Sequence, residues 1–143
     1  MGNRDLKGLF SSATDDWATP QAFFDELNSE FHFTLDPCAS PTNAKCKRYY
    51  TREQDGLFKD WQGERVFCNP PYGREIAKWV HKCYIESRKK NTLVVALLPA
   101  RTDTQWFHNL IYHKAREIRF IKGRLRFGGS DVNAPFPSMV VIF

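Results

Sequence analysis

In this 143-residue chain, the residues whose types and spacing could carry out chemistry are those of the tetrapeptide Asn69-Pro70-Pro71-Tyr72. An amine attached to an aromatic base is a poor nucleophile, because its lone pair is delocalised into the ring. Two acceptors holding both of its N–H groups, the side-chain oxygen of Asn69 and the backbone carbonyl of Pro70, would aim that lone pair at an electrophilic methyl group. The two prolines stiffen the loop, and Tyr72 offers a face for stacking, which contributes about 1–3 kcal/mol per base. The tetrapeptide therefore favours methyl transfer to a planar nitrogen, with positioning as the main catalytic device.

A Pro-Pro turn with a packed tyrosine is the alternative interpretation of so short a motif, and its context argues against it. The motif follows a short apolar strand at residues 66–68 and precedes helical spacing over residues 74–88. Asp36 likewise ends an expected strand, since Pro37 cannot donate to a ladder. In α/β sheets ligands bind beyond the carboxyl ends of the strands. We therefore expect Asp36 and Asn69 to face the same crevice.

The elements that must position these side chains alternate along the chain. Three helices are expected. The first starts at Thr19-Pro20, with Thr19 as its cap and Pro20 at the first helical position. The second spans residues 74–88, and the third starts after Asp103 as its cap. Strands are expected at residues 31–35, 66–68, 93–98, 118–121 and 139–143. This alternation predicts an α/β fold, a Rossmann-like sandwich around a mostly parallel sheet. Residues 1–16 are polar and predict a flexible N-terminal arm, and residues 17–143 predict one domain.

Composition limits the class of partner and the compartment. The net charge of +5 suits an anionic partner such as nucleic acid, although mild basicity can also serve solubility alone. The four cysteines form no CxxC pair, so no metal site is predicted. The polar start and the lack of an apolar run of ~20 residues predict a cytoplasmic protein without a membrane anchor and with reduced thiols.

Beyond the tetrapeptide, the chain resembles the phage and prophage family of DNA N6-adenine methyltransferases, which use S-adenosylmethionine. The matching segments follow one another in order from about residue 16 to the end of the chain, and together they are far more specific than the tetrapeptide. They are Trp17-Ala18-Thr19-Pro20, Leu35-Asp36-Pro37-Cys38-Ala39-Ser40, Asn43-Ala44-Lys45-Cys46, Asp55-Gly56-Leu57, Asn69-Pro70-Pro71-Tyr72, Leu98-Pro99-Ala100-Arg101-Thr102-Asp103, Gly123-Arg124-Leu125-Arg126-Phe127 and Ala134-Pro135-Phe136-Pro137-Ser138.

The resemblance implies a role for each predicted site residue. The target adenine in DNA would be flipped out of the duplex, because its amine cannot be reached while stacked. Asn69, Pro70, Pro71 and Tyr72 would hold that base, and Phe127 would pack against its other face. Thr19-Pro20 would hold the methionine part of S-adenosylmethionine. The loop Asp36-Pro37-Cys38-Ala39 would also line the cofactor site, and Asp55 would contact the adenine ring of the cofactor.

The chain departs from the broader methyltransferase pattern around the cofactor. The loop after Asp36 lacks the glycines that usually let a backbone approach the cofactor closely. Few positions separate Asp36 from Asn69, so we expect a shortened methyltransferase domain. An acidic residue for the cofactor ribose has no clear match: Glu53 is a weak candidate, and Asp36 could serve there or could bind the amino group of the methionine part.

Several assignments stay open from the sequence. Arg101 could contact phosphate or a base edge, or pair with Asp103. Arg124 lies in the basic stretch 116–126, which could contact phosphate or form a solvated strand face. Sequence specificity would come from loops on the core, with residues 40–62 and 128–135 as the candidates, or from a second subunit. The protein could be a monomer or a homodimer. Trp79, Trp106 and Phe107 are expected in the core, and Trp17 could cover the cofactor site.

Two other functions fit part of the pattern. A protein glutamine methyltransferase can use the same tetrapeptide, because a side-chain amide is also a planar nitrogen. The basic charge and the family resemblance count against it. A catalytically weak nucleic-acid-binding module is the alternative from another class, which the shortened cofactor region favours.

Overall fold

Six strands form one mixed sheet in the order β2-β1-β3-β4-β6-β5. The computed structural model describes residues 17–128 and 132–143, so the predicted arm 1–16 lies outside the described residues. The strands are β1 (Leu35–Asp36), β2 (Arg48–Tyr49), β3 (Arg65–Cys68), β4 (Leu93–Pro99), β5 (Glu117–Phe120) and β6 (Ser138–Ile142). The helices are α2 (Gln21–Phe31), the short 3₁₀ helix η1 (Gly56–Phe58), α3 (Ile76–Ser87) and α4 (Gln105–Leu110).

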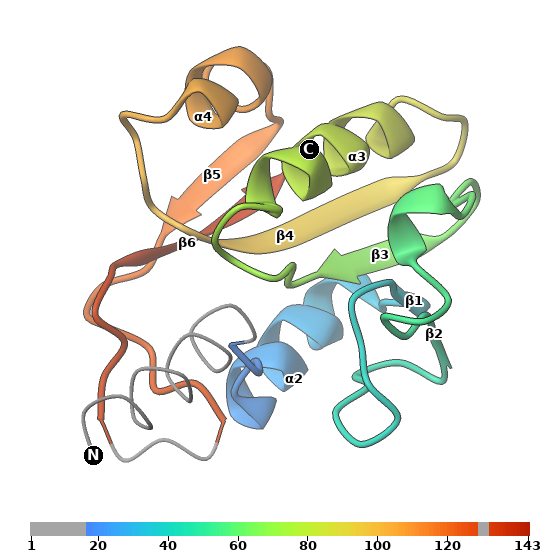
Figure 1. Cartoon of the computed structure of the whole chain (residues 1–143), viewed down its shortest axis with the longest axis horizontal. Helices are drawn as coiled ribbons and strands as arrows, with labels where there is room; N and C mark the ends of the chain where they lie inside the picture. The colour runs from blue at the N-terminus through green and yellow to red at the C-terminus, as the bar shows by residue number, and fades with distance from the viewer. Residues whose placement is uncertain (1–16, 129–131) are drawn as a thin grey trace, which may run out of the picture.

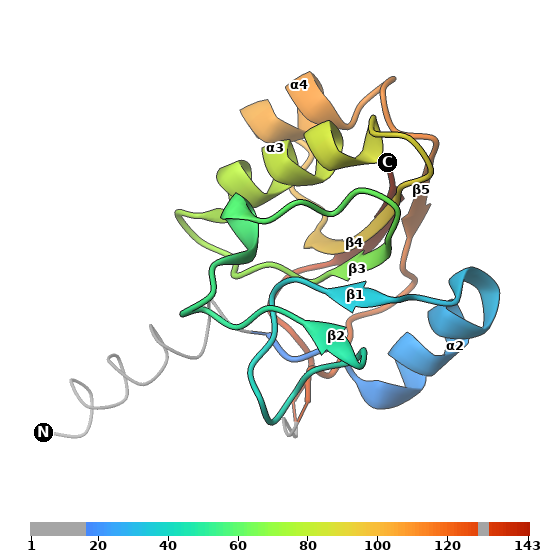
Figure 2. The ribbon, with the colours of Figure 1, turned by 90° about the vertical axis from the view of Figure 1, so that its right-hand side faces the viewer.

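The helices cover both faces of the sheet. Figures 1 and 2 show α2 on one face and α3 with α4 on the other. All the β6 residues, and those of β4 after Leu93, are buried, as expected for apolar strands covered on both faces. The core also holds Trp79, Trp106 and Phe107, as predicted. The α/β class and the shortened domain are therefore confirmed.

The parallel part of the sheet is smaller than predicted. Strands β2, β1, β3 and β4 pair in parallel, whereas β6 runs antiparallel between β4 and β5. Parallel neighbours need a long crossover connection, usually a helix. The described residues between β5 and β6 form no helix, and the two strands pair directly as antiparallel neighbours.

The predicted strand 31–35 is wrong over most of its length. Phe31 is the last residue of α2, which ends at His32 in a left-handed conformation, with φ 54° and its N–H donating to the Asn28 carbonyl. Only Leu35 and Asp36 form a strand. Phe33 lies in the connection, where its ring packs 5.3 Å from that of Phe67. The apolar alternation thus arises from a helix end and a core contact, while Asp36 does end its strand as predicted.

Two predicted helix caps are also different in the structure. Pro20 is itself the N-cap of α2 and no side chain caps that helix, so Thr19 is not the cap. In α4 the cap is Thr104 and not Asp103: its hydroxyl accepts from the Phe107 N–H at 3.2 Å. The Thr19 hydroxyl is therefore available for another contact.

Residues 40–62 contain little regular structure and are fixed by a buried tryptophan. The Trp61 side chain is fully buried, and its indole N–H donates to the Gly56 carbonyl at 3.0 Å. Its backbone N–H donates to the buried carboxylate of Glu86 on α3 at 2.7 Å. These bonds tie η1 to α3.

No helix within the described residues is long and apolar enough to cross a membrane.

Candidate active site

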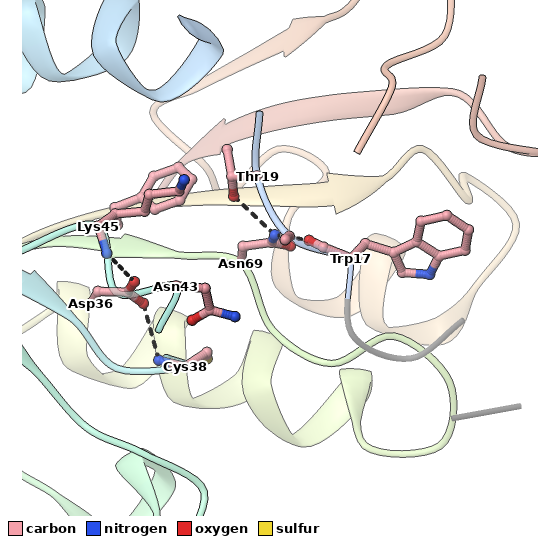
Figure 3. A pocket seen from close by; sticks show the side chains of 9 residues that line it. Trp17, Thr19, Asp36, Cys38, Asn43, Lys45 and Asn69 are labelled. Atoms are coloured by element: carbon pink, nitrogen blue, oxygen red, sulfur yellow. Dashed lines mark hydrogen bonds between the residues drawn. The ribbon is translucent and has the colours of Figure 1, made fainter. Parts of the chain in front are cut away.

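The neighbouring strands β1 and β3 end at the same pocket. Asp36 closes β1, Asn69 follows β3, and both line a small cavity of about 50 Å³ together with Thr19 and Cys38. Figure 3 shows the Thr19 side chain directed at Asn69, and the Asp36 carboxylate directed at the backbone nitrogens of Cys38 and Lys45. The predicted meeting of Asp36 and Asn69 is therefore confirmed.

The Asn69 amide is held by the segment that precedes α2. Its Nδ2 donates to the backbone carbonyl of Trp17 and to the Thr19 hydroxyl, the latter at 2.9 Å. Its Oδ1 is buried and has no hydrogen-bond partner among the described residues. A buried acceptor without a partner is uncommon in native structures and calls for an explanation. Here it offers an acceptor for an incoming N–H group.

The Asp36 carboxylate organises the loop that follows β1. One oxygen accepts from the backbone N–H of Cys38 at 3.2 Å and the other from that of Lys45 at 3.0 Å. Burial raises the pKa of Asp36 above its ordinary value, and these two N–H groups oppose the rise. Each oxygen keeps a lone pair for a further donor, so Asp36 can hold the loop and an ammonium group together.

A second cavity, of about 140 Å³, adjoins the first. Four predicted cofactor residues line it: Pro37, Cys38, Ala39 and Asp55. Pro71 of the tetrapeptide lines it as well, and Cys38 and Asn43 line both cavities. One continuous site therefore runs from Asp55 past the Asp36 loop to Asn69. Pro20 and Glu53 line neither cavity.

Four aromatic rings, one of them from Tyr72 of the tetrapeptide, pack against one another. Tyr72 is buried and its hydroxyl donates to the Leu97 carbonyl at 3.0 Å. The rings of Tyr72 and Phe127 lie edge to face, with centroids 6.4 Å apart and planes at 89°. Trp17 and Phe136 complete this group, 5.2 Å apart. We call these four residues the aromatic cluster.

Burial holds two cysteine thiols near Asp36 in the protonated form. All four are free, and the Sγ atoms of Cys38 and Cys68 lie 3.6 Å apart. Burial raises the pKa of the Cys68 thiol well above its usual value, and burial followed by the charge of Asp36 raises that of Cys46 to about 12. Thiolates are the reactive form of cysteine, so these two side chains stay protonated and inert at neutral pH.

The family follows from comparison with known proteins. A family model described as DNA N-6-adenine-methyltransferase (Dam) matches residues 8–141. The chain belongs to this Dam family. The predictions of the family and of an adenine-specific DNA methyltransferase are thereby confirmed.

Dam-family relatives in phages match most of the chain. It is 34% identical to the DNA N-6-adenine-methyltransferase of Haemophilus phage HP1 over 140 residues, which cover 92% of this chain and 80% of the relative. It is 35% identical to the DNA N-6-adenine-methyltransferase of Escherichia phage T1 over 129 residues, 87% of this chain and 53% of the relative. A putative methyltransferase of Escherichia coli K12, YfdM, is 42% identical over 66 residues, 41% of this chain and 71% of the relative.

The basic residues of this Dam-family chain are partly engaged within the fold. Arg101 follows β4 and lies over the ring of Phe136 at 5.9 Å, and Arg124 donates to the Ala134 carbonyl at 3.3 Å. Arg119 is bound by Glu30 and Glu117, so this member of the basic stretch is a structural residue. Arg101 is exposed and stays a predicted DNA contact, as does Arg124.

Three residues near the site were given no place there by sequence reasoning alone. Asn43 and Lys45 line the first cavity, and Phe136 belongs to the aromatic cluster. All three lie in segments that carry the family resemblance, which is the signal that could have identified them. Their contacts depend on tertiary packing and not on a local pattern.

Gly56→Ala is expected to distort the second cavity, which is lined by Gly56 and by residues predicted to hold the cofactor. A Cβ atom at Gly56 would lie 2.3 Å from the Pro37 carbonyl oxygen, and neither backbone can yield cheaply. We expect the free energy of unfolding to fall by about 1–3 kcal/mol and the affinity for S-adenosylmethionine to fall, as calorimetry would measure. Gly63→Ala is the matched control, since alanine would be strained at the φ of +83° there but would meet no atom within 4 Å. Equal losses of affinity in both variants would contradict the steric explanation.

Proposed function

We propose that this chain transfers the methyl group of S-adenosylmethionine to the exocyclic N6 amine of an adenine flipped out of duplex DNA. The observation that supports this most is the buried, unpaired Oδ1 of Asn69 at the carboxyl edge of the sheet. The family match is to DNA N-6-adenine-methyltransferases, and their substrate has an amine with two N–H groups to be held.

The site fits the cofactor chemically. When bound, S-adenosylmethionine supplies an electrophilic methyl group on a sulfonium. The Asp36 carboxylate suits the ammonium of its methionine part, and the cavity lined by Pro37, Ala39 and Asp55 suits its adenine ring. Thr19 lines the first cavity and Pro20 follows it in the chain, and their backbone and apolar atoms are proposed to contact the methionine part.

Asn69 and Pro70 would orient the target amine. The Asn69 Oδ1 and the Pro70 carbonyl each accept one N–H of the adenine amine, which leaves the nitrogen lone pair directed at the methyl group. As the new N–C bond formed, the bond between the methyl group and the sulfonium sulfur would break, a neutral thioether would leave, and the methylated nitrogen would release one N–H proton to solvent. Positioning of this kind can supply several kcal/mol of the barrier without a tuned general base.

Base entry requires the aromatic cluster to open. Two rings that sandwich a base lie nearly parallel and about 7 Å apart, twice the ~3.5 Å contact distance of carbon atoms. Tyr72 and Phe127 are perpendicular in the structure. The proposed sandwich therefore needs the Phe127 ring to rotate or withdraw, while Arg101 and Arg124 bind phosphates of the surrounding DNA.

The experiment that tests this function maps the methyl group. The full chain is incubated with radiolabelled S-adenosylmethionine and with unmethylated duplex DNA, and the DNA is digested to nucleosides. We expect label in N6-methyladenine. Binding of DNA without label transfer would support a catalytically weak binding module. Label appearing only in glutamine of an added protein would indicate the glutamine methyltransferase alternative.

The pKa of Asp36 gives a pH prediction. Because burial raises this carboxyl's pKa above 3.8, acidification protonates Asp36 earlier than an ordinary aspartate and removes its contact with the ammonium of the cofactor. Affinity should therefore fall as the pH drops through the raised pKa, by roughly tenfold or more for a charge-assisted bond. Folding favours the protonated form in this window, so the free energy of unfolding falls as the pH rises through it.

Cofactor affinity and the contribution of Asp36 to stability should thus change in opposite directions over the same pH window. Calorimetric titration with S-adenosylmethionine and thermal unfolding, both between about pH 4 and pH 7, measure the two trends. Asp36→Asn is the control: its affinity should be weak and independent of pH. The difference in stability between wild type and variant isolates Asp36 from Glu30, Asp60 and Glu86, whose lowered pKa values act in the opposite direction. Parallel pH profiles in the wild type and the variant would remove Asp36 as the titrating group.

A further inference from the structure

The orientation of the Asn69 amide is fixed from outside the catalytic loop. The Trp17 carbonyl oxygen can only accept a hydrogen bond, so the side of the amide that faces it must be the NH₂ group. The Thr19 hydroxyl accepts the second bond from the same nitrogen at 2.9 Å. Both Nδ2 hydrogens are then used, and Oδ1 is the part of the amide left for the substrate.

The segment carrying these two acceptors is itself held on both sides. Gly128 donates its N–H to the Ala18 carbonyl at 2.7 Å, and the Phe24 N–H donates to the Pro20 carbonyl at 3.0 Å. Thr19 is buried and does not cap α2. Its hydroxyl therefore has a fixed position against Asn69 and no competing role in the helix.

We propose that Thr19 is a positioning residue that locks the Asn69 amide with Oδ1 directed at the target amine. This inference rests on the proposed function. An amide rotated by 180° would present its NH₂ group to the N–H groups of the adenine amine, and two donors cannot bond. Thr19 and the Trp17 carbonyl prevent that rotation, so the loop meets its substrate with an acceptor already in place.

The lock also explains why an amide suits position 69. A carboxylate there has no hydrogen to donate, and it would face the Trp17 carbonyl oxygen with a second acceptor. The Thr19 hydroxyl could rotate to donate, but the Trp17 carbonyl could not. Asn69→Asp is therefore expected to lose activity although it keeps an acceptor oxygen toward the substrate.

The test replaces Thr19 with the nearly isosteric valine, which removes the acceptor, and with serine, which keeps it. For Thr19→Val we expect kcat for DNA methylation to fall about tenfold to hundredfold, because a misplaced reacting group costs this much. The dissociation constant of S-adenosylmethionine, measured by calorimetry, should stay within about twofold of wild type, because valine keeps the backbone and the methyl group through which Thr19 is proposed to contact the cofactor. Thr19→Ser should restore kcat. A weaker cofactor affinity with unchanged kcat would overturn the lock and assign Thr19 to the cofactor alone.

A double variant separates coupling from general damage. In an Asn69→Ala background Thr19→Val should cause no further loss of kcat, because the group that it orients is gone. Additive losses would overturn the proposal. Thermal unfolding of each variant checks that the protein is folded, and Thr19→Ala provides a smaller substitution if valine does not fit.

A second measurement does not depend on methylation. In the nuclear magnetic resonance spectrum of the free protein, both Asn69 side-chain amide protons should exchange slowly with solvent. Thr19→Val should speed the exchange of one proton, and Thr19→Ser should slow it again. An unchanged exchange rate in Thr19→Val would refute the lock. A wild-type protein that shows this pattern but methylates no DNA would refute the proposed function and leave the lock standing.

Discussion

Asn69→Ala is expected to lower kcat for DNA methylation by about 10²–10³-fold, the usual cost of removing one preorganised hydrogen-bonding group at the reacting atom. The substitution removes the buried, unpaired Oδ1 and with it one of the two acceptors for the adenine amine. The remaining acceptor would be the Pro70 carbonyl, which cannot fix the lone pair alone. Filter assays of label transfer to DNA measure the rate under saturating cofactor.

The fold should tolerate this substitution. Asn69→Ala gives up two hydrogen bonds from Nδ2 but also removes a buried acceptor that has no partner among the described residues. These effects oppose each other, so we expect a small change in melting temperature. The affinity for S-adenosylmethionine should stay within a few fold.

Asn109→Ala is the matched control for Asn69→Ala. Asn109 is an exposed residue of α4, so the same chemical change is made outside the site. It should leave kcat unchanged. If Asn69→Ala keeps more than about a tenth of the wild-type rate, the amide is not the group that orients the amine, and the proposed mechanism fails.

The site could be predicted from the sequence where one local signal was enough. Pro37 and Pro70 end their strands because proline cannot donate to a ladder, and parallel neighbours bring their carboxyl ends together. These two rules place Asp36 and Asn69 in one cavity, as the structure has them. Neither rule depends on the packing of the rest of the chain.

The rest depended on contacts between distant segments. Phe31 and Phe33 alternate like a strand, yet one ends α2 and the other packs on Phe67. Thr19 is a residue type that often caps helices, but its hydroxyl accepts a hydrogen bond from Asn69, fifty positions away. Hydrophobic periodicity and secondary-structure propensity describe residues that are close in sequence, and tertiary contacts of this kind override them.

Sheet direction shows the same limit. The apolar run 139–143 predicts a buried strand, and β6 is buried along its whole length. Its position between β4 and β5, and its antiparallel direction, depend on how the chain returns after β5. A run of apolar residues indicates that a strand is buried but does not indicate its direction in the sheet. The prediction of parallel pairing is therefore correct only for β2, β1, β3 and β4.

Tyr72→Ala is expected to lower both stability and activity. The side chain is 2% exposed, and truncating a buried aromatic to alanine costs about 3–5 kcal/mol of unfolding free energy. The proposed stacking of the target base on this ring would be lost as well, at about 1–3 kcal/mol per base. Chemical denaturation measures the first loss. Methylation per folded molecule, expected to fall about tenfold or more, measures the second.

Tyr72→Phe separates the ring of Tyr72 from its hydroxyl. Burial holds the pKa of Tyr72 well above its usual value, so its hydroxyl stays protonated and donates to the Leu97 carbonyl. Phenylalanine loses that bond, at about 1 kcal/mol, but keeps the face for stacking and should keep most of kcat. Phe107→Ala, a buried ring of α4 that stacks on Tyr112, should destabilise the fold as much as Tyr72→Ala does without lowering kcat per folded molecule. Only base stacking predicts both results. If kcat falls in Tyr72→Phe, or in Phe107→Ala, as much as it falls in Tyr72→Ala, then Tyr72 is a core residue and does not stack on the base.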